Sequence, residues 1–122
     1  LDLKKYLKFQ IKKKNSIFLG IFNKKGLHIG NVKLDNINFK RSTAVFGILI
    51  GNRSWRNKGV TSEVIKALSQ WSFKKYKISK FILGVEKRNV QAIKAYKKSN
   101  FIELNKNNKN TIVMEKNLIN IF

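Results

Sequence analysis

The spacing of apolar residues predicts a chain that begins with a helix and continues with strands. In residues 2–14, leucine, tyrosine and isoleucine recur at intervals of three or four with lysines between them, which favours an amphipathic helix. Residues 16–22 and 27–34 are apolar segments separated by the turn sequence NKKG at 23–26, so we expect a hairpin. After a polar stretch, residues 42–51 are almost continuously apolar, as in strands buried on both faces.

The second half of the chain alternates between helical and extended patterns. Apolar residues spaced for one helix face predict a helix over 60–77, and a second helix is expected over 89–98. Residues 80–86, 101–105 and 111–116 are short strand candidates. This order predicts an α/β (α+β) fold, a mixed, mainly antiparallel central sheet flanked by helices.

Composition limits the class of protein without identifying it. The 122 residues suit a single domain over 1–122, with 43% hydrophobic residues to build a core. The chain has no cysteine and one histidine, so we expect no disulfide and no metal site. No apolar run approaches the roughly 20 residues that span a bilayer, and no signal peptide is evident, so we expect a cytoplasmic protein with no membrane contact.

The charge of +21 is the most extreme property of the sequence. Such a charge indicates a polyanionic partner such as nucleic acid. However, lysine, asparagine, isoleucine and phenylalanine, all with codons rich in A and T, make up half of the chain, and the lysines are spread along it. We therefore attribute most of the charge to codon bias and do not expect nucleic acid as the partner.

The segment after the apolar run 42–51 is suited to bind an anion. The first turn of a helix has backbone N–H groups without partners and the positive end of the peptide dipole. Gly59 precedes such a turn, leaves room for phosphate oxygens, and stands beside Arg56 and Lys58. The segment matches neither the P-loop nor the Gly-x-Gly-x-x-Gly pattern. The alternative is that Gly59 merely eases a strand-to-helix turn.

A second motif lies in NVQAIKAYKKSNF at 89–101. Asn89 and Tyr96 are seven residues apart, so they share one face of the predicted helix. An amide and a phenol on that face can both point into one cleft. The alternative is that Asn89 caps the helix and Tyr96 packs in the core.

Together the two motifs resemble the GNAT acetyltransferase superfamily, in the branch of ribosomal-protein and amino-sugar N-acetyltransferases. Residues 56–61 are similar to the Gln/Arg-x-x-Gly-x-Gly/Ala corner of that family, although Thr61 replaces a small residue. The later motif Asn-x-x-Ala/Ser-x-x-x-Tyr-x-Lys-x-Gly-Phe is matched from Asn89 to Phe101, with Asn100 in place of glycine. The family's first strand and helix would precede Leu1, so either the chain is truncated or its amino-terminal edge is reduced.

The resemblance implies an acetyl-CoA-dependent N-acetyltransferase and a set of site residues. Tyr96 would be the general acid that protonates the CoA thiolate, and Glu86 the leading candidate for the general base. Backbone groups of the strand would pair with the pantetheine arm, and the corner would hold the pyrophosphate. The acetyl-CoA-binding residues would be Ile48, Leu49, Ile50, Arg56, Asn57, Lys58, Gly59, Val60, Thr61, Ser62, Asn89, Tyr96 and Lys98.

The base and the acceptor are the least defined parts of this hypothesis. Asp35 is a second candidate base, Glu63 could support the corner, His28 is expected to be structural, and a water chain could serve instead. The acceptor would be the primary amine of a small molecule, with a nucleotide-linked amino sugar as one candidate and a ribosomal-protein N-terminus as another. A monomer or homodimer is expected. The alternatives from other classes are a basic nucleic-acid-binding domain and a catalytically silent acyl-CoA-binding domain.

Overall fold

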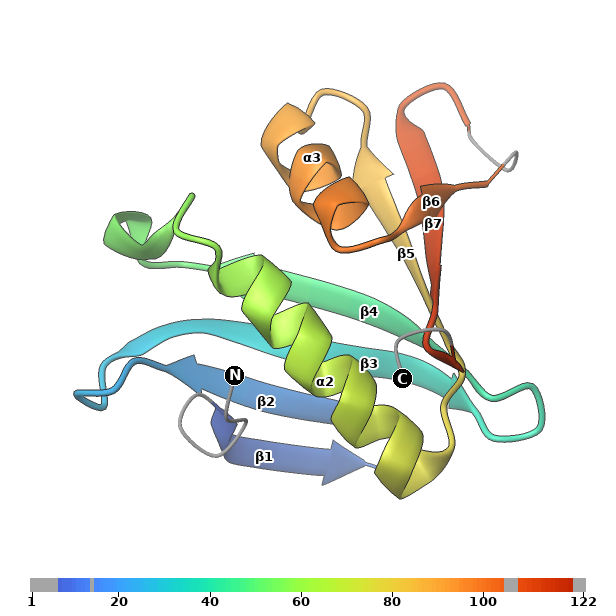
Figure 1. Cartoon of the computed structure of the whole chain (residues 1–122), viewed down its shortest axis with the longest axis horizontal. Coiled ribbons are helices and arrows are strands. Elements are labelled where there is room, and N and C mark those ends of the chain that lie inside the picture. Colours follow the sequence, from blue (N-terminus) through green and yellow to red (C-terminus); the bar gives the residue numbers. More distant parts are fainter. Residues whose placement is uncertain (1–6, 14, 105–107, 120–122) are drawn as a thin grey trace.

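The computed structural model describes the backbone of residues 7–13, 15–104 and 108–119, and side chains from residue 15 onward. Its centre is a seven-stranded sheet in the order β1-β2-β3-β4-β5-β7-β6 (Figure 1). All neighbouring strands are antiparallel except β4 and β5, which run parallel. The strands are β1 (Leu7–Lys13), β2 (Ser16–Phe22), β3 (His28–Asn38), β4 (Thr43–Ile50), β5 (Lys80–Glu86), β6 (Ile102–Glu103) and β7 (Thr111–Asn117).

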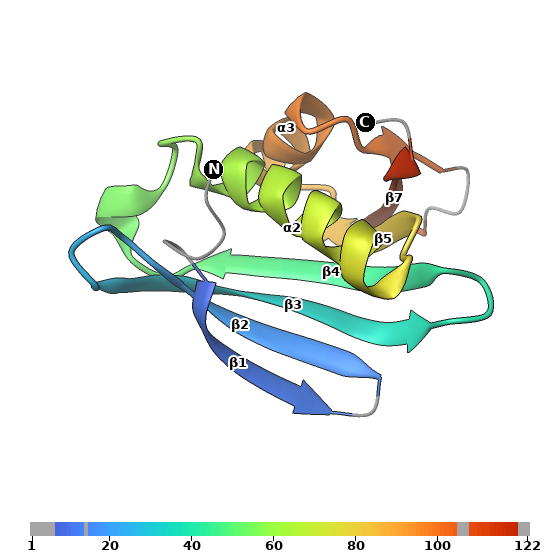
Figure 2. The ribbon, with the colours of Figure 1, turned by 60° about the horizontal axis from the view of Figure 1, so that its bottom comes forward.

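Two helices and one short turn complete the described fold. The 3-10 turn η1 (Arg53–Trp55) follows β4 and leads into α2 (Val60–Tyr76), and α3 (Val90–Lys98) follows β5. Figure 2 shows α2 and α3 on the same side of the sheet, with α2 lying over β2 to β4. No helix in the described part of the chain is long and apolar enough to cross a membrane.

The core lies between the sheet and α2 because the two periodicities place their apolar residues on facing surfaces. Along β2, Ile17, Leu19 and Ile21 are buried while Phe18 between them is exposed, which is the period of two expected for a strand. Along α2 the residues at helical spacing are buried, and Val64 and Leu68 are fully so. One cluster of buried side chains joins these elements to β3, β4, β5 and β7.

The parallel strands β4 and β5 stay paired over only part of their length. The registered pairs run from Thr43 with Lys80 to Val45 with Ile82, and no pair follows. Beyond Val45 the β4 edge that faces β5 is therefore free of a strand partner. Figure 1 shows the two strands diverging, with α3 beside β5. This divergence determines where the candidate site forms.

The element order predicted from sequence is confirmed from β2 to β7, with corrections at three places. Residues 7–13, expected in a helix, form strand β1 at the sheet edge, while residues 2–6 and 14 of that expected helix lie outside the described part. Leu7, Phe9 and Ile11 alternate with polar residues, and six of the seven residues of β1 pair with β2, which otherwise would be an unpaired edge. In addition, β3 extends through Asn38 into the expected polar stretch, and β6 is only two residues long.

Candidate active site

A cleft of about 590 Å³ opens where β4 and β5 separate. It is lined by the end of β4, by the corner before α2, by the first turn of α2 and by one face of α3. Every donor-site residue predicted from sequence lines this cleft except Lys58, which is exposed and outside it. The structure thus brings together two motifs that lie about 30 residues apart in the sequence.

Gly59 is the N-cap of α2 and has a left-handed backbone with φ of 78°. Its neighbour Asn57 also has a positive φ, of 60°. No side chain caps α2, so the first N–H groups of the helix are open to a ligand. A Cβ built at Gly59 would meet no heavy atom within 4 Å, and the cleft continues along residues 60–62 of the first helical turn. An anionic group fits such a helix start.

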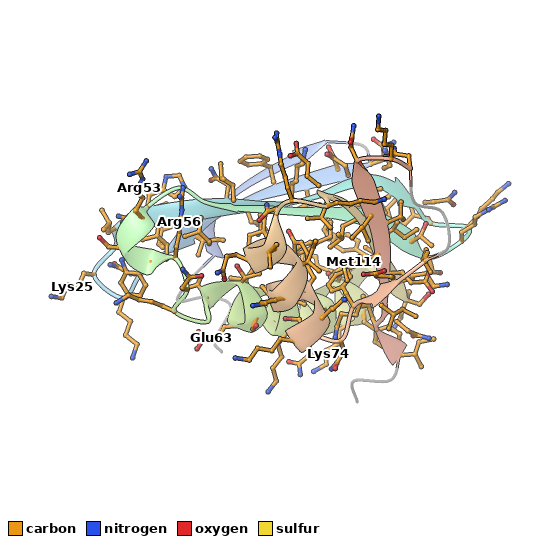
Figure 3. The ribbon with its side chains drawn as sticks, turned by 90° about the horizontal axis from the view of Figure 1, so that it is seen from above. Lys25, Arg53, Arg56, Glu63, Lys74 and Met114 are labelled. Atoms are coloured by element: carbon orange, nitrogen blue, oxygen red, sulfur yellow. The ribbon has the colours of Figure 1, made fainter. Side chains whose placement is uncertain are left out.

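The corner is held against the end of β4 by Arg56. Its Nε donates a hydrogen bond to the carbonyl of Ile50 at 2.9 Å, and this fixes the loop that leads into the helix. Asn52 caps the η1 turn by accepting a hydrogen bond from the Ser54 N–H at 3.0 Å. In Figure 3, Arg53 and Arg56 lie together at this end of the molecule. Of these two arginines, Arg56 lines the cleft and brings a positive charge to it.

Tyr96 lies in the last part of α3 and is 9% exposed. Its ring packs edge-on to Phe46, with centroids 6.4 Å apart, and against Phe101 at 5.6 Å. Burial raises the pKa of the Tyr96 phenol above its ordinary value of 10.0, so the hydroxyl keeps its proton at neutral pH. Tyr96 therefore packs in the core, lines the cleft and carries a protonated hydroxyl at neutral pH.

Asn89 is both a helix cap and a cleft residue, the two alternatives that the sequence allowed. Its side-chain oxygen accepts a hydrogen bond from the N–H of Ala92 at 3.2 Å, so it caps α3. It also lines the cleft. At the other end of this helix Asn100 adopts a left-handed φ of 70°, which asparagine tolerates where the family motif has glycine.

None of the described carboxylates lines the cleft, and the histidine does not line it either, so the candidate base Glu86 lies outside the cleft that holds Tyr96. Glu86 is exposed, pairs with Arg88 at 3.0 Å, and lines a separate hollow of about 370 Å³. Asp35 pairs with Lys33 at 3.1 Å. The His28 Nε2 lies 2.8 Å from the Asn31 side-chain oxygen, and its ring stacks on Phe22.

Glu86 is turned away because β5 alternates sides. Phe81, Leu83 and Val85 of this strand point into the core, so Glu86 takes the opposite, solvent-facing side. Glu63, in the first turn of α2, is exposed as well and stands outside the cleft.

Five residues outside the predicted donor-site set also line the cleft. Trp55 comes from the η1 turn, and Gln91, Ala92, Lys94 and Ala95 come from α3. The helix residues could have been found from the face that Asn89 shares with Tyr96, because positions three or four apart are neighbours on a helix. Nothing in the local pattern placed Trp55 toward the cleft rather than toward solvent.

The arrangement of a diverging parallel strand pair, an open helix start and a buried phenol defines an acyl-CoA-dependent transferase. Residues 2–102 match the model of the acetyltransferase (GNAT) domain, and the chain belongs to this family. It is therefore an acyltransferase, and acetyl-CoA is the acetyl donor. No curated protein sequence matches the chain.

Solved structures share this fold at low sequence identity. A dodecameric spermidine N-acetyltransferase from Vibrio cholerae is 22% identical, with a TM-score of 0.76 over 87% of this chain and 67% of that one. The structure of the V. cholerae enzyme with CoA and spermine gives the same identity and TM-score over 87% and 68%. A chimera of that enzyme with a second acetyltransferase reaches a TM-score of 0.78 at 22% identity, over 88% and 69%. The chain thus spans about two thirds of the length of these proteins.

Proposed function

We propose that the chain transfers the acetyl group of acetyl-CoA to the primary amine of a small molecule inside the cleft between β4 and α3. The observation that carries this proposal is that Gly59 and Tyr96 line the same cleft. An uncapped helix start suits the pyrophosphate, and a protonated phenol suits the leaving thiolate.

The donor-binding roles follow from the position of each element. Backbone N–H groups of the first turn of α2 hold the pyrophosphate, and Arg56 adds positive charge. Backbone groups at the free edge of β4, from Ile48 to Ile50, form hydrogen bonds with the amides of the pantetheine arm. The arm thus takes the place of a neighbouring strand. Asn89 and Lys98 provide polar contacts from α3.

Acetyl transfer needs a proton donor, a stabilised oxyanion and a proton acceptor. The amine nitrogen bonds to the thioester carbonyl carbon, and the carbon–sulfur bond then breaks. A backbone N–H of β4 stabilises the oxyanion, and Tyr96 donates its proton to the departing thiolate. Because no described carboxylate lines the cleft, the proton of the amine passes to water rather than to Glu86.

The charge around the cleft favours an acceptor that carries negative charge. All described carboxylates except Glu63 pair with a lysine or arginine of this chain, so few acidic groups are free to bind a cationic acceptor. The second hollow, lined by residues 86–88 and 109–111, contains three cations, Lys87, Arg88 and Lys109, against one carboxylate, Glu86. A nucleotide-linked amino sugar, with its phosphates on these cations and its amine directed to the cleft, fits this surface.

A screen for CoA release tests the proposal. The full chain with acetyl-CoA is offered nucleotide-linked amino sugars, amino acids, peptides with free N-termini, and the polyamines spermidine and spermine. We expect turnover with an anionic amine and little with the polyamines, whose multiple ammonium groups meet a cationic surface. Turnover with the polyamines alone would contradict the proposed acceptor, and the absence of CoA release with every amine would contradict the proposed transfer.

A further inference from the structure

Lys116 on β7 is a charged residue in the interior. The residue is only 4% exposed, and its Nζ donates a hydrogen bond to the carbonyl of Ser99 at 2.7 Å. In the part of the chain that the structure describes, no carboxylate forms an ion pair with it. Burial lowers its pKa below the ordinary value of 10.5. Burying an ammonium group with a single acceptor among the described residues costs free energy, so packing alone does not explain the position of Lys116.

Ser99, the acceptor, is the C-cap of α3, the helix that carries Tyr96. The C-terminal end of a helix is its negative end, which a cation stabilises. The N–H of Phe101 closes this end by donating to the Tyr96 carbonyl at 3.0 Å. Lys116 therefore holds the C-terminal end of α3 against the sheet. The contact is at Ser99, three residues after Tyr96.

The side chain of Ser99 continues the connection toward the donor site. Its hydroxyl forms a 3.1 Å hydrogen bond with the hydroxyl of Ser62. Ser62 belongs to the first turn of α2 and lines the cleft at the proposed pyrophosphate position. One chain of contacts, from Lys116 through Ser99 to Ser62, thus joins β7 to the ends of both helices that form the cleft.

We propose that Lys116 is a positioning residue for the transfer proposed above. Through Ser99 it sets the C-terminal end of α3 against the first turn of α2, so that the phenol and the phosphate-binding N–H groups face one bound acetyl-CoA. The residue itself touches no substrate. Its effect on rate comes entirely from the placement of Tyr96 and Ser62.

Two variants separate this role from a contribution to folding alone. Lys116→Met keeps an unbranched side chain of similar length but removes the donor. Ser99→Ala keeps the carbonyl that Lys116 binds and removes only the connection to Ser62. Lys80→Met is the matched control, because it removes a lysine from the neighbouring strand, where Lys80 pairs with Glu115 at 3.5 Å.

Steady-state kinetics, calorimetric binding of CoA and thermal unfolding are measured for the wild type, the three variants and the Lys116→Met/Ser99→Ala double variant. We expect kcat/KM for acetyl-CoA to fall roughly tenfold in Lys116→Met, with a smaller loss in Ser99→Ala, while Lys80→Met stays at the wild-type value. The double variant should be no worse than Lys116→Met, because both changes break one connection.

Turnover by the wild type tests the proposed function independently of the role of Lys116. If the wild type is active and Lys116→Met has wild-type kinetic constants, the positioning role is wrong whatever the melting temperature. Fully additive losses in the double variant would also contradict it. Should Lys116→Met fail to fold, Lys116→Gln decides, because it removes the charge and leaves a shorter donor: a kcat/KM below the wild-type value at an unchanged melting temperature supports the role, and wild-type kinetic constants overturn it.

Discussion

Tyr96 combines packing and chemistry, and one substitution separates the two. Tyr96→Phe keeps the ring contacts with Phe46 and Phe101 but removes the proton donor. We expect kcat to fall by roughly 100-fold, with acetyl-CoA affinity and the melting temperature nearly unchanged. The check is a comparison of kcat with CoA binding and thermal unfolding for both proteins. Wild-type turnover by the variant would leave Tyr96 with a packing role only.

Gly59 has a matched control elsewhere in the chain. Gly59 and Gly26 both have left-handed backbones, with φ of 78° and 85°, and at both an added Cβ meets nothing within 4 Å. Changing either to leucine should cost about 1–2 kcal/mol of stability through backbone strain. However, only Gly59→Leu should weaken CoA binding, because only that side chain enters the proposed phosphate position. Equal CoA affinities of the two variants, measured by calorimetry, would refute the phosphate-binding role.

The buried Lys116 predicts an unusual pH dependence of stability. Its pKa is lowered in the folded chain, so between that lowered value and 10.5 the unfolded chain binds a proton that the folded chain lacks. Unfolding free energy then rises with pH across this window. Relative to Lys116→Met, the wild type should therefore gain stability as pH rises from neutral toward 10.5. Denaturant unfolding of both proteins at several pH values measures the difference, and a constant difference would disprove the prediction.

At the scale of elements, sequence pattern succeeded where one period dominated a segment. The alternation in β2 and the helical stripe of α2 each determine a single burial face, and both elements were predicted within about one residue. Residues 7–13 allowed two periods at once, since Leu7 and Ile11 suit a helix while Leu7, Phe9 and Ile11 suit a strand. Pairing with β2 decides between them, and that contact is not visible in the local sequence.

The candidate site was predictable to the extent that its motifs are local. The corner at Gly59 and the α3 face of Asn89 and Tyr96 are short patterns, and both reach the same cleft. The position of Glu86 could have been found from the local pattern, because the alternation of Phe81, Leu83 and Val85 places Glu86 on the opposite side of β5. The burial of Lys116, by contrast, could not be predicted, because nothing in the local sequence distinguishes it from the many exposed lysines.

At the scale of the whole molecule, the charge of +21 makes a testable prediction for the anionic acceptor proposed above. Salt screens the attraction between this charge and an anionic amine. The screening length falls from about 30 Å at roughly 0.01 M ionic strength to about 8 Å at roughly 0.15 M. We therefore expect kcat/KM for an anionic acceptor to fall severalfold over that range, while a neutral amine of similar size changes little. The same salt response for both amines would show that the charge plays no part in acceptor binding.

In the proposed complex, acetyl-CoA occupies the cleft with its pyrophosphate on the first turn of α2. Calorimetric titration of the full chain with CoA and with pantetheine, which lacks the nucleotide and its phosphates, tests this claim without an acceptor. We expect CoA to bind roughly tenfold more tightly than pantetheine, and Gly59→Leu to remove most of that difference. Equal affinities of the wild type for the two ligands would contradict it.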